Sequence, residues 1–152
     1  MPGLLLLFFV SMDNSSNPNP ERDFHFAAPE LIACYDLFSA QMKSAGIDYL
    51  VTCVKRTKAK QAKLYAQGRT IPGPIVTNAK PGQSPHNCDV PGALAFDIAI
   101  ISDGKLLWNG DHKLYKQAGA IGKSCGLEWG GDFRNYDPGH FQVAKWKEKV
   151  KT

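Results

Sequence analysis

Three residues of kinds that bind metal ions stand in the central and C-terminal parts of the chain: His86, Asp97 and His140. Residues 94–100 alternate in a way that predicts a strand, with Asp97 between two alanines on one face and larger apolar side chains on the other. Because these neighbours are small, we expect the carboxylate to face a cavity instead of a packed core. Residues 140–144 predict a second strand beginning with His140, and His86 stands in the loop before the first strand.

Together these residues offer a metal ion two imidazoles and one carboxylate. Zinc in hydrolases usually takes three nitrogen or oxygen ligands and keeps a fourth position for water. The combination therefore predicts a hydrolytic zinc site. Cys88 and Asp89, close to His86, remain alternative ligands, and we prefer Asp97 because its strand fixes its direction. We expect the other two histidines at the surface: His25 and His112.

The elements that must hold these residues follow from helical and strand periodicity, caps and breakers. They are, in order, a helix from Pro29 to Gly46, a buried strand at 49–54, a helix at 58–67, a loop at 70–83, the strand at 94–100, a helix from its cap Asp111 to Gly126, and the strand at 140–144. The expected inward side chains are Leu31, Cys34, Phe38 and Met42 in the first helix, and Ala59, Ala62, Leu64 and Tyr65 in the second.

These elements predict an α+β fold, in which a small antiparallel sheet bears the zinc site and two or three helices pack against it. The loop at 70–83 is rich in Pro and Gly and is too long for a simple connector. Loops of that kind usually line binding or catalytic sites. We therefore expect it beside the metal.

Composition indicates one globular domain, which we expect at residues 23–152. The chain has 152 residues, of which 43% are apolar and 21% charged, so it can form one core without disulfides. The net charge of +4 is too mild and dispersed to predict nucleic-acid binding. The four cysteines include no Cys-x-x-Cys pair, so we expect free thiols, although their even number would permit two disulfides.

The first residues need a separate interpretation. Residues 4–10 are a pure apolar run followed by the polar, Pro-rich stretch 13–20. The run is too short to span a bilayer, and as a signal-peptide core it lacks a preceding Lys or Arg. A start at Met12 in place of Met1 explains it equally well. We expect residues 1–22 to lie outside the folded domain, as disordered chain or a mis-assigned leader.

Several motifs in order resemble one family, the zinc D-Ala-D-Ala carboxypeptidases and phage L-alanyl-D-glutamate endopeptidases. The resemblance spans residues 28–144 and is carried by Lys55-Arg56-Thr57 with the helix after it, by Ser84-Pro85-His86 followed by Gly92, Ala95 and Asp97, and by Glu128-Trp129-Gly130-Gly131-Asp132 leading into Asp137-Pro138-Gly139-His140-Phe141. One departure is that His86 and Asp97 are separated by four additional residues, within 87–94. An insertion there would reshape the rim of the cleft without moving either ligand.

The resemblance implies a fold of the hedgehog or D-Ala-D-Ala peptidase type, with zinc on His86, Asp97 and His140. It implies that Asp137 is the catalytic base and that Arg56 stabilises negative charge on the substrate. Ser84 and Gln61 are expected to contact substrate as well. If Asp137 is not the base, the next candidates are Glu128 and Asp132.

Within this family, residues 64–70 and 129–132 look more like the phage-type endopeptidases. We therefore predict a monomeric phage or prophage endolysin that cuts the L-Ala–D-Glu bond of peptidoglycan stem peptides. It would stay in the host cytoplasm until a holin releases it to the periplasm or cell wall, unless the apolar run at 4–10 secretes it. The alternatives are a D-Ala-D-Ala carboxypeptidase on the same scaffold and a non-catalytic, metal-containing cell-wall-binding module, against which the intact Asp137 argues.

Overall fold

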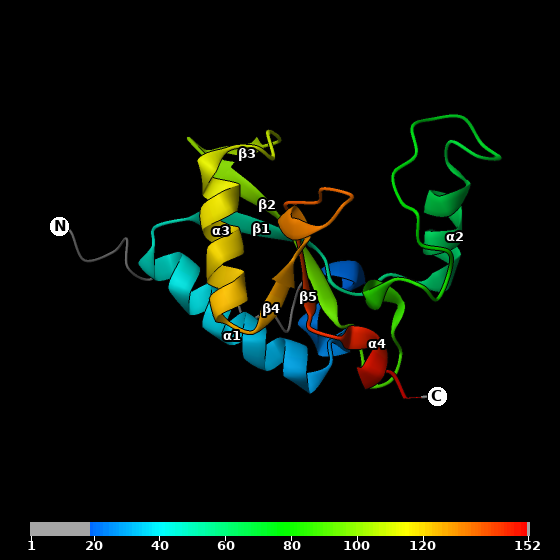
Figure 1. Ribbon diagram of the computed structural model, residues 1–152, viewed down its shortest axis with the longest axis horizontal. Coiled ribbons are helices and arrows are strands. Elements are labelled where there is room, and N and C mark those ends of the chain that lie inside the picture. The colour runs from blue at the N-terminus through cyan, green and yellow to red at the C-terminus, as the bar shows by residue number, and fades with distance from the viewer. Residues whose placement is uncertain (1–18, 152) are drawn as a thin grey trace.

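The structure is a computed structural model that describes residues 19–151, and one antiparallel sheet lies at its centre (Figure 1). The strand order is β1-β2-β5-β4, and the short β3 pairs with the far half of β2, beyond the end of β5. The strands are β1 (Asp48–Cys53), β2 (Ala95–Ser102), β3 (Lys105–Leu107), β4 (Leu127–Trp129) and β5 (His140–Val143). The predicted α+β class and antiparallel sheet are confirmed. The sequence did not predict β3 or β4.

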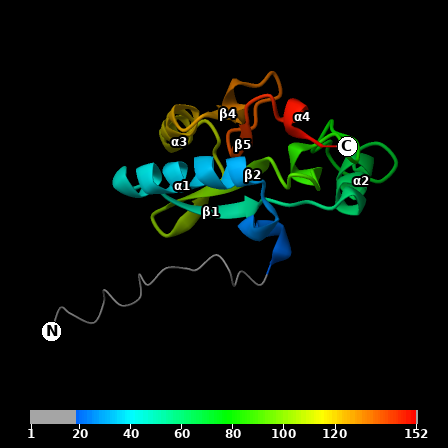
Figure 2. The same cartoon turned by 90° about the horizontal axis from the view of Figure 1, so that it is seen from below.

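Two helices, α1 (Pro29–Ser44) and α3 (Lys113–Ser124), pack together against the sheet (Figures 1 and 2). The predicted inward stripe of α1 is buried at Leu31, Phe38 and Met42. The ring of Phe38 contacts two sheet residues, with centroids 5.2 Å from Phe96 and 4.9 Å from Phe141. These aromatic rings form the centre of the core and fix the sheet against the helices.

Glycine lets α3 approach the sheet closely. A Cβ atom at Gly119 would lie 2.3 Å from the ring of Trp129, and one at Gly122 would lie 2.4 Å from the ring of Phe141. Neither position has room for a side chain. The predicted cap of α3 is wrong: His112, not Asp111, precedes the first helical residue, and its Nδ1 accepts from the Leu114 amide at 3.2 Å.

The second predicted helix, α2 (Lys58–Ala66), stands away from the sheet and forms an arm with the loop that follows it (Figure 1). The prediction that Ala59 and Ala62 point inward is wrong, because both are exposed. The buried residue of α2 is instead Gln61. The helix packs mainly against the loop that follows it, through the contacts of Gln61 with Thr77 and Ala79. Most of its surface is therefore not covered by the rest of the protein.

The ends of the chain add three observations. The predicted leader falls mostly in residues 1–18, which lie outside the described residues. Pro20–Arg22 lies against β1, and the Glu21 carbonyl accepts from the amides of Val54 and Lys55, so the folded part extends at least three residues before residue 23. A short α4 (Trp146–Lys149) follows β5. No helix within residues 19–151 is long and apolar enough to cross a membrane.

Candidate metal centre

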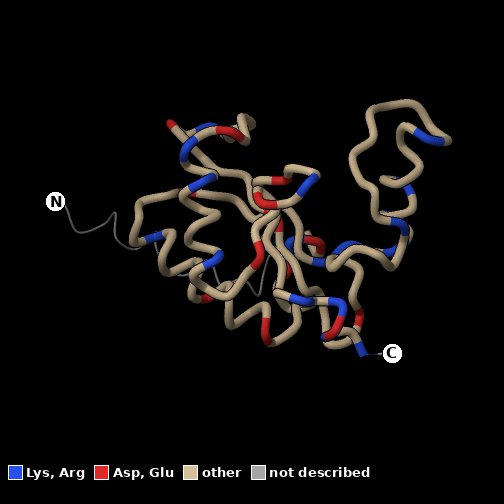
Figure 3. Tube along the Cα trace, in the orientation of Figure 1, with Lys and Arg blue, Asp and Glu red and all other residues tan. Residues whose placement is uncertain are grey.

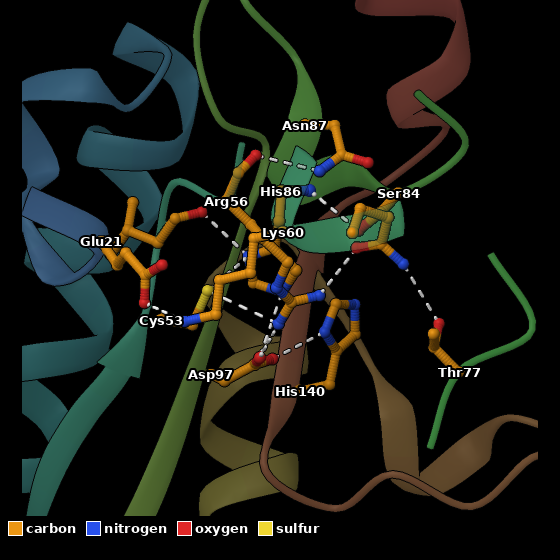
Figure 4. A network of polar contacts seen from close by, with 12 residues as sticks. Glu21, Cys53, Arg56, Lys60, Thr77, Ser84, His86, Asn87, Asp97 and His140 are labelled. Atoms are coloured by element: carbon orange, nitrogen blue, oxygen red, sulfur yellow. Dashed lines mark hydrogen bonds and ion pairs between the residues drawn. The ribbon is translucent and has the colours of Figure 1, made fainter. Parts of the chain in front are cut away.

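Strand register brings the predicted ligands together. Asp97 on β2 pairs directly with His140 on β5, so their side chains stand next to each other on one face of the sheet. His86 reaches the same point from the 3₁₀ turn Pro85–Asn87. The two oxygens of Asp97 face one histidine each: Oδ2 lies 3.2 Å from His86 Nε2, and Oδ1 lies 2.8 Å from His140 Nδ1 (Figure 4). All three predicted ligands therefore converge.

The orientation of His86 is fixed by its surroundings. The Ser84 hydroxyl accepts from the His86 amide at 3.2 Å and begins the turn. His86 Nδ1 lies 2.8 Å from the Val54 carbonyl, which only accepts, so Nδ1 carries the hydrogen. Nε2 is left buried and without a hydrogen-bond partner in the described residues, facing Asp97. A buried nitrogen opposite a carboxylate oxygen is well placed to bind a cation.

The electrostatics of the metal-free protein also favour a cation between His86 and Asp97. Burial lowers the pKa of His86, but the charge of Asp97 outweighs burial and raises this pKa to about 10. Burial likewise raises the pKa of Asp97, but the charge on His86 and the hydrogen bond from His140 outweigh it and hold the pKa of Asp97 well below its usual value. A positive charge, carried by a proton or a metal ion, is therefore strongly favoured between these groups.

A fourth group close to this centre is Cys53, for which the sequence predicted only a free thiol. Asp97 pairs with Cys53 on β1, and the potential ligand atoms of Cys53, His86 and Asp97 all lie within 4.8 Å of one another. Its sulfur, however, lies 3.7 Å from His86 Nδ1, the nitrogen that bonds to the Val54 carbonyl. The thiol thus stands behind the imidazole.

The two alternative ligands from the sequence point elsewhere. Asp89 forms a 2.5 Å ion pair with Lys55, and its side chain is mostly exposed. Cys88 is buried, and its sulfur donates to the Val90 carbonyl at 3.3 Å. The additional residues after His86 therefore form a separate turn, and neither residue reaches Asp97.

Arg56 lies beside the centre, as the motif predicted. Its NH2 atom is 3.6 Å from Asp97 Oδ2, and its NH1 atom donates to Gln61 Oε1 at 3.0 Å. Gln61 is completely buried, and its amide donates to the Ala79 carbonyl at 2.8 Å. Gln61 does not line the cleft, so it holds Arg56 instead of contacting a ligand itself. Ser84 does line the cleft.

A cleft of about 750 Å³ opens over the centre. Its walls include the three predicted ligands, Arg56 and Asp137 on one side, and the arm residues Leu64, Ile75, Val76 and Thr77 on the other. The loop at 70–83 therefore borders the site, as predicted. Asp137 is exposed at the rim, where desolvation and the charge of Asp97 raise its pKa. A carboxylate with a raised pKa is suited to take up and return a proton.

Sequence reasoning missed three residues that the fold brings here: Cys53, Asn87 and Gln142. Asn87 donates to the Arg56 carbonyl at 2.9 Å, and Gln142 lies 2.9 Å from His140 Nε2. The alternation of β5, which placed His140, also puts Gln142 on the same face, whereas an irregularity in β1 between Val51 and Cys53 brings Cys53 opposite Asp97. Only the register, however, makes them neighbours.

The chain is similar to several known peptidases. The sequence profile of a peptidase M15 family described as D-alanyl-D-alanine carboxypeptidase matches residues 77–143. The peptidoglycan L-alanyl-D-glutamate endopeptidase CwlK of Bacillus subtilis (strain 168) is 35% identical over 109 residues, which are 66% of this chain and 63% of that protein. The chain thus spans less than two thirds of the length of this relative.

Three solved structures share the fold. ChiX, an L-Ala D-Glu endopeptidase of Serratia marcescens, aligns with a TM-score of 0.59 and 18% identity over 84% of this chain and 87% of its own. The LD-carboxypeptidase LdcB aligns with a TM-score of 0.63 and 17% identity, over 90% of this chain and 74% of its own. A variant of the vancomycin-resistance D,D-pentapeptidase VanY, solved with Zn(II), aligns with a TM-score of 0.56 and 20% identity, over 87% of this chain and 78% of its own. These three likenesses show the shared fold, and the matched profile with the 35% identity to CwlK shows that the chain belongs to the M15 peptidases, the VanY-like family.

Proposed function

We propose that this protein is a zinc-dependent peptidase that hydrolyses the L-Ala–D-Glu bond of peptidoglycan stem peptides. The observation that carries the proposal is the meeting of His86 Nε2, Asp97 and His140 Nδ1 at the floor of a cleft, with Nε2 buried and facing the Asp97 carboxylate. Two nitrogens and a carboxylate are a donor set typical of catalytic zinc.

These three residues would hold the zinc ion, and Cys53 would not. His140 Nδ1 contacts the carboxylate that His86 Nε2 also faces, whereas the thiol lies beside the far nitrogen of His86. When bound, zinc supplies Lewis acidity, which activates water and polarises the scissile carbonyl.

The chain's own groups would do the remaining work. Asp137, with its raised pKa, would take the proton from the attacking water and return it to the leaving amine. The Arg56 guanidinium, fixed by Gln61, would stabilise the negative charge that develops on the substrate oxygen, or pair with a substrate carboxylate.

The bond is proposed from the motifs and from the named activity of CwlK. The family profile, described as D-alanyl-D-alanine carboxypeptidase, favours a second candidate, removal of a terminal D-Ala. Mass spectrometry of muropeptides from digested sacculi separates the two. New amino-terminal D-Glu ends support the endopeptidase, loss of terminal D-Ala supports the carboxypeptidase, and wall binding without any new end would favour the binding module.

Metal dependence is tested in the same preparation. We expect about one zinc ion per chain after repletion and loss of wall lysis on chelation, because three protein ligands hold the ion that the reaction needs. Lysis that resists chelation would contradict the proposal.

The role as a phage endolysin rests on the motif resemblance alone. It predicts that the protein accumulates in the cytoplasm of a bacterial host and lyses it only when a holin is produced as well. Lysis by the protein without a holin would instead favour secretion through the apolar residues 4–10.

A further inference from the structure

On the side away from Asp97, His140 is connected to two further polar side chains. Its Nε2 atom lies 2.9 Å from Gln142 Oε1, and Gln142 Nε2 donates to Glu128 Oε2 at 2.7 Å. Gln142 and Glu128 are direct partners in the pairing of β4 with β5, and His140 is two residues from Gln142 on the same face of the sheet. Strand pairing thus sets the order of the three groups.

Each contact in this series can have only one direction. The Glu128 carboxylate only accepts hydrogen bonds, so the end of the Gln142 amide that faces it must be the NH2 group. The other end of that amide, its oxygen, then faces His140 and also only accepts. His140 Nε2 must therefore carry a hydrogen atom and donate it to Gln142.

Burial makes this arrangement hard to replace with water. His140 is 7% exposed and Gln142 is 8% exposed. The residue paired with Gln142 on its other side is Ala95, which is too small to compete for its amide. Glu128 is held at its second oxygen by the backbone amide of Lys145, at 3.4 Å.

We propose that Glu128 and Gln142 are positioning residues that hold His140 in the form with hydrogen on Nε2, so that Nδ1 is directed at the metal. In the metal-free protein Nδ1 lies 2.8 Å from Asp97 Oδ1 and donates to it. When a metal ion replaces that hydrogen, an imidazole with hydrogen on Nε2 offers the ion the lone pair of Nδ1. The inference rests on the proposed function insofar as His140 is a zinc ligand. It assigns Glu128 a role other than that of catalytic base.

The two histidines thus donate from different ring nitrogens, and different kinds of acceptor hold them. His86 donates from Nδ1 to the Val54 carbonyl and offers Nε2, whereas His140 donates from Nε2 to Gln142 and offers Nδ1. A main-chain acceptor holds the first imidazole. The second depends on two side chains, so substitution can remove its support without altering the backbone.

The test exchanges the two groups. Gln142→Met keeps the length of the side chain and removes the acceptor, and we expect zinc affinity to fall by about 10- to 100-fold, the usual cost of losing a partner of a ligating histidine. The double variant Glu128→Gln/Gln142→Glu reverses the pair: the new amide donates to the new carboxylate, which still accepts from His140. It should therefore recover affinity to within about threefold of the wild type. Gln41→Met, at an exposed helical position, is the matched control.

Two readouts need no hydrolysis: zinc affinity by competition with a chelator, and the Nε2–H resonance of His140 in zinc-loaded, ¹⁵N-histidine-labelled protein. We expect a slowly exchanging Nε2–H signal in the wild type and the double variant, and its loss in Gln142→Met. If Gln142→Met is not folded by circular dichroism, Glu128→Gln alone should show a smaller loss of affinity, because the Gln142 amide is then free to turn. Unchanged affinity and signal in the folded single variants, or no recovery in the double variant, would overturn the proposal. A wild type that binds zinc but cuts no muropeptide would count against the proposed function alone.

Discussion

The sheet wall of the cleft carries the carboxylate of Asp97 and the imidazole of His140 on paired strands, with His86 on the turn beside them. The arm, residues 58–83, carries five basic residues and no acidic one, and the arm residues that line the cleft are uncharged. Figure 3 shows the charged residues of the arm, along which only Lys and Arg are coloured. Every proposed metal ligand belongs to the sheet wall, and His86 and His140 are buried there. On the arm, Ile71, Ile75 and Val76 are each about half exposed.

The difference separates two tasks. Catalytic groups must be held to within a fraction of an ångström, which paired strands and a packed core provide. The arm packs against little besides its own loop, and its charge and apolar side chains are suited to gathering an extended anionic substrate. Changes in the sheet wall should therefore alter metal binding and turnover, and changes in the arm should alter association.

The largest effect is expected for His140→Ala. Removal of one of three ligands leaves two, which hold zinc weakly, so zinc content and wall lysis should both be lost. Metal analysis of the purified variant after zinc repletion checks this. If the variant kept a full equivalent of zinc, the metal would be bound elsewhere, and Cys53 would become the first residue to substitute.

Asp137→Asn should separate catalysis from metal binding within the same wall. The amide keeps the size of the side chain but cannot accept a proton, so turnover should fall about a hundredfold or more while zinc and fold persist. The measurement is the rate of release of new amine ends from sacculi, with zinc content determined in parallel. Near wild-type lysis would exclude Asp137 as the base and leave Asp132 as the first alternative.

The ion pair at the centre predicts how the metal-free protein responds to pH. The pKa of His86 is raised from 6.5 to about 10 in the folded state. Its contribution to the free energy of unfolding is therefore complete below pH 6.5 and is lost as pH rises through about 10. Because the pKa of Asp97 is lowered in the folded state, its contribution to the free energy of unfolding is lost only as the pH falls into the acid range. Between pH 6.5 and 9 the free energy of unfolding should fall by on the order of 2 kcal/mol.

Urea unfolding of chelator-treated protein at several pH values measures this fall. Asp97→Asn should flatten the dependence, because it removes the carboxylate that raises the His86 pKa. A metal-free wild type that grew more stable between pH 6.5 and 9 would show that the pair is not formed.

The smallest effect is expected on the arm. Lys63→Glu with Lys80→Glu should weaken association with sacculi by only about two- to fivefold, and less at high salt, because exposed charges are screened. The rate on a small soluble stem peptide at saturation should stay unchanged. Cosedimentation with sacculi at two salt concentrations checks the first point. A lower saturating rate on the soluble peptide would show that the arm takes part in catalysis after all.

The sequence by itself determined the chemistry of the site and much of the local structure. Strand periodicity put Asp97 and His140 on the faces opposite the large apolar residues of their strands, and breakers and caps delimited α1, α2 and β1 closely. These features are local, since they depend on the two- and 3.6-residue repeats of the backbone. The same repeats misled at Ala59 and Ala62, because a pattern shows which face is apolar but not whether anything covers it.

Tertiary structure alone decided which polar groups meet. The sequence preferred Asp97 to Asp89 from the direction of its strand, but the contact itself comes from the pairing of β2 with β5, which puts Asp97 against His140, while Lys55 forms an ion pair with Asp89. Register is a long-range property, set by packing of the whole core and not by any segment. For the same reason, no local pattern could show that Gln142 and Glu128, fourteen positions apart, would stand in line behind a ligand.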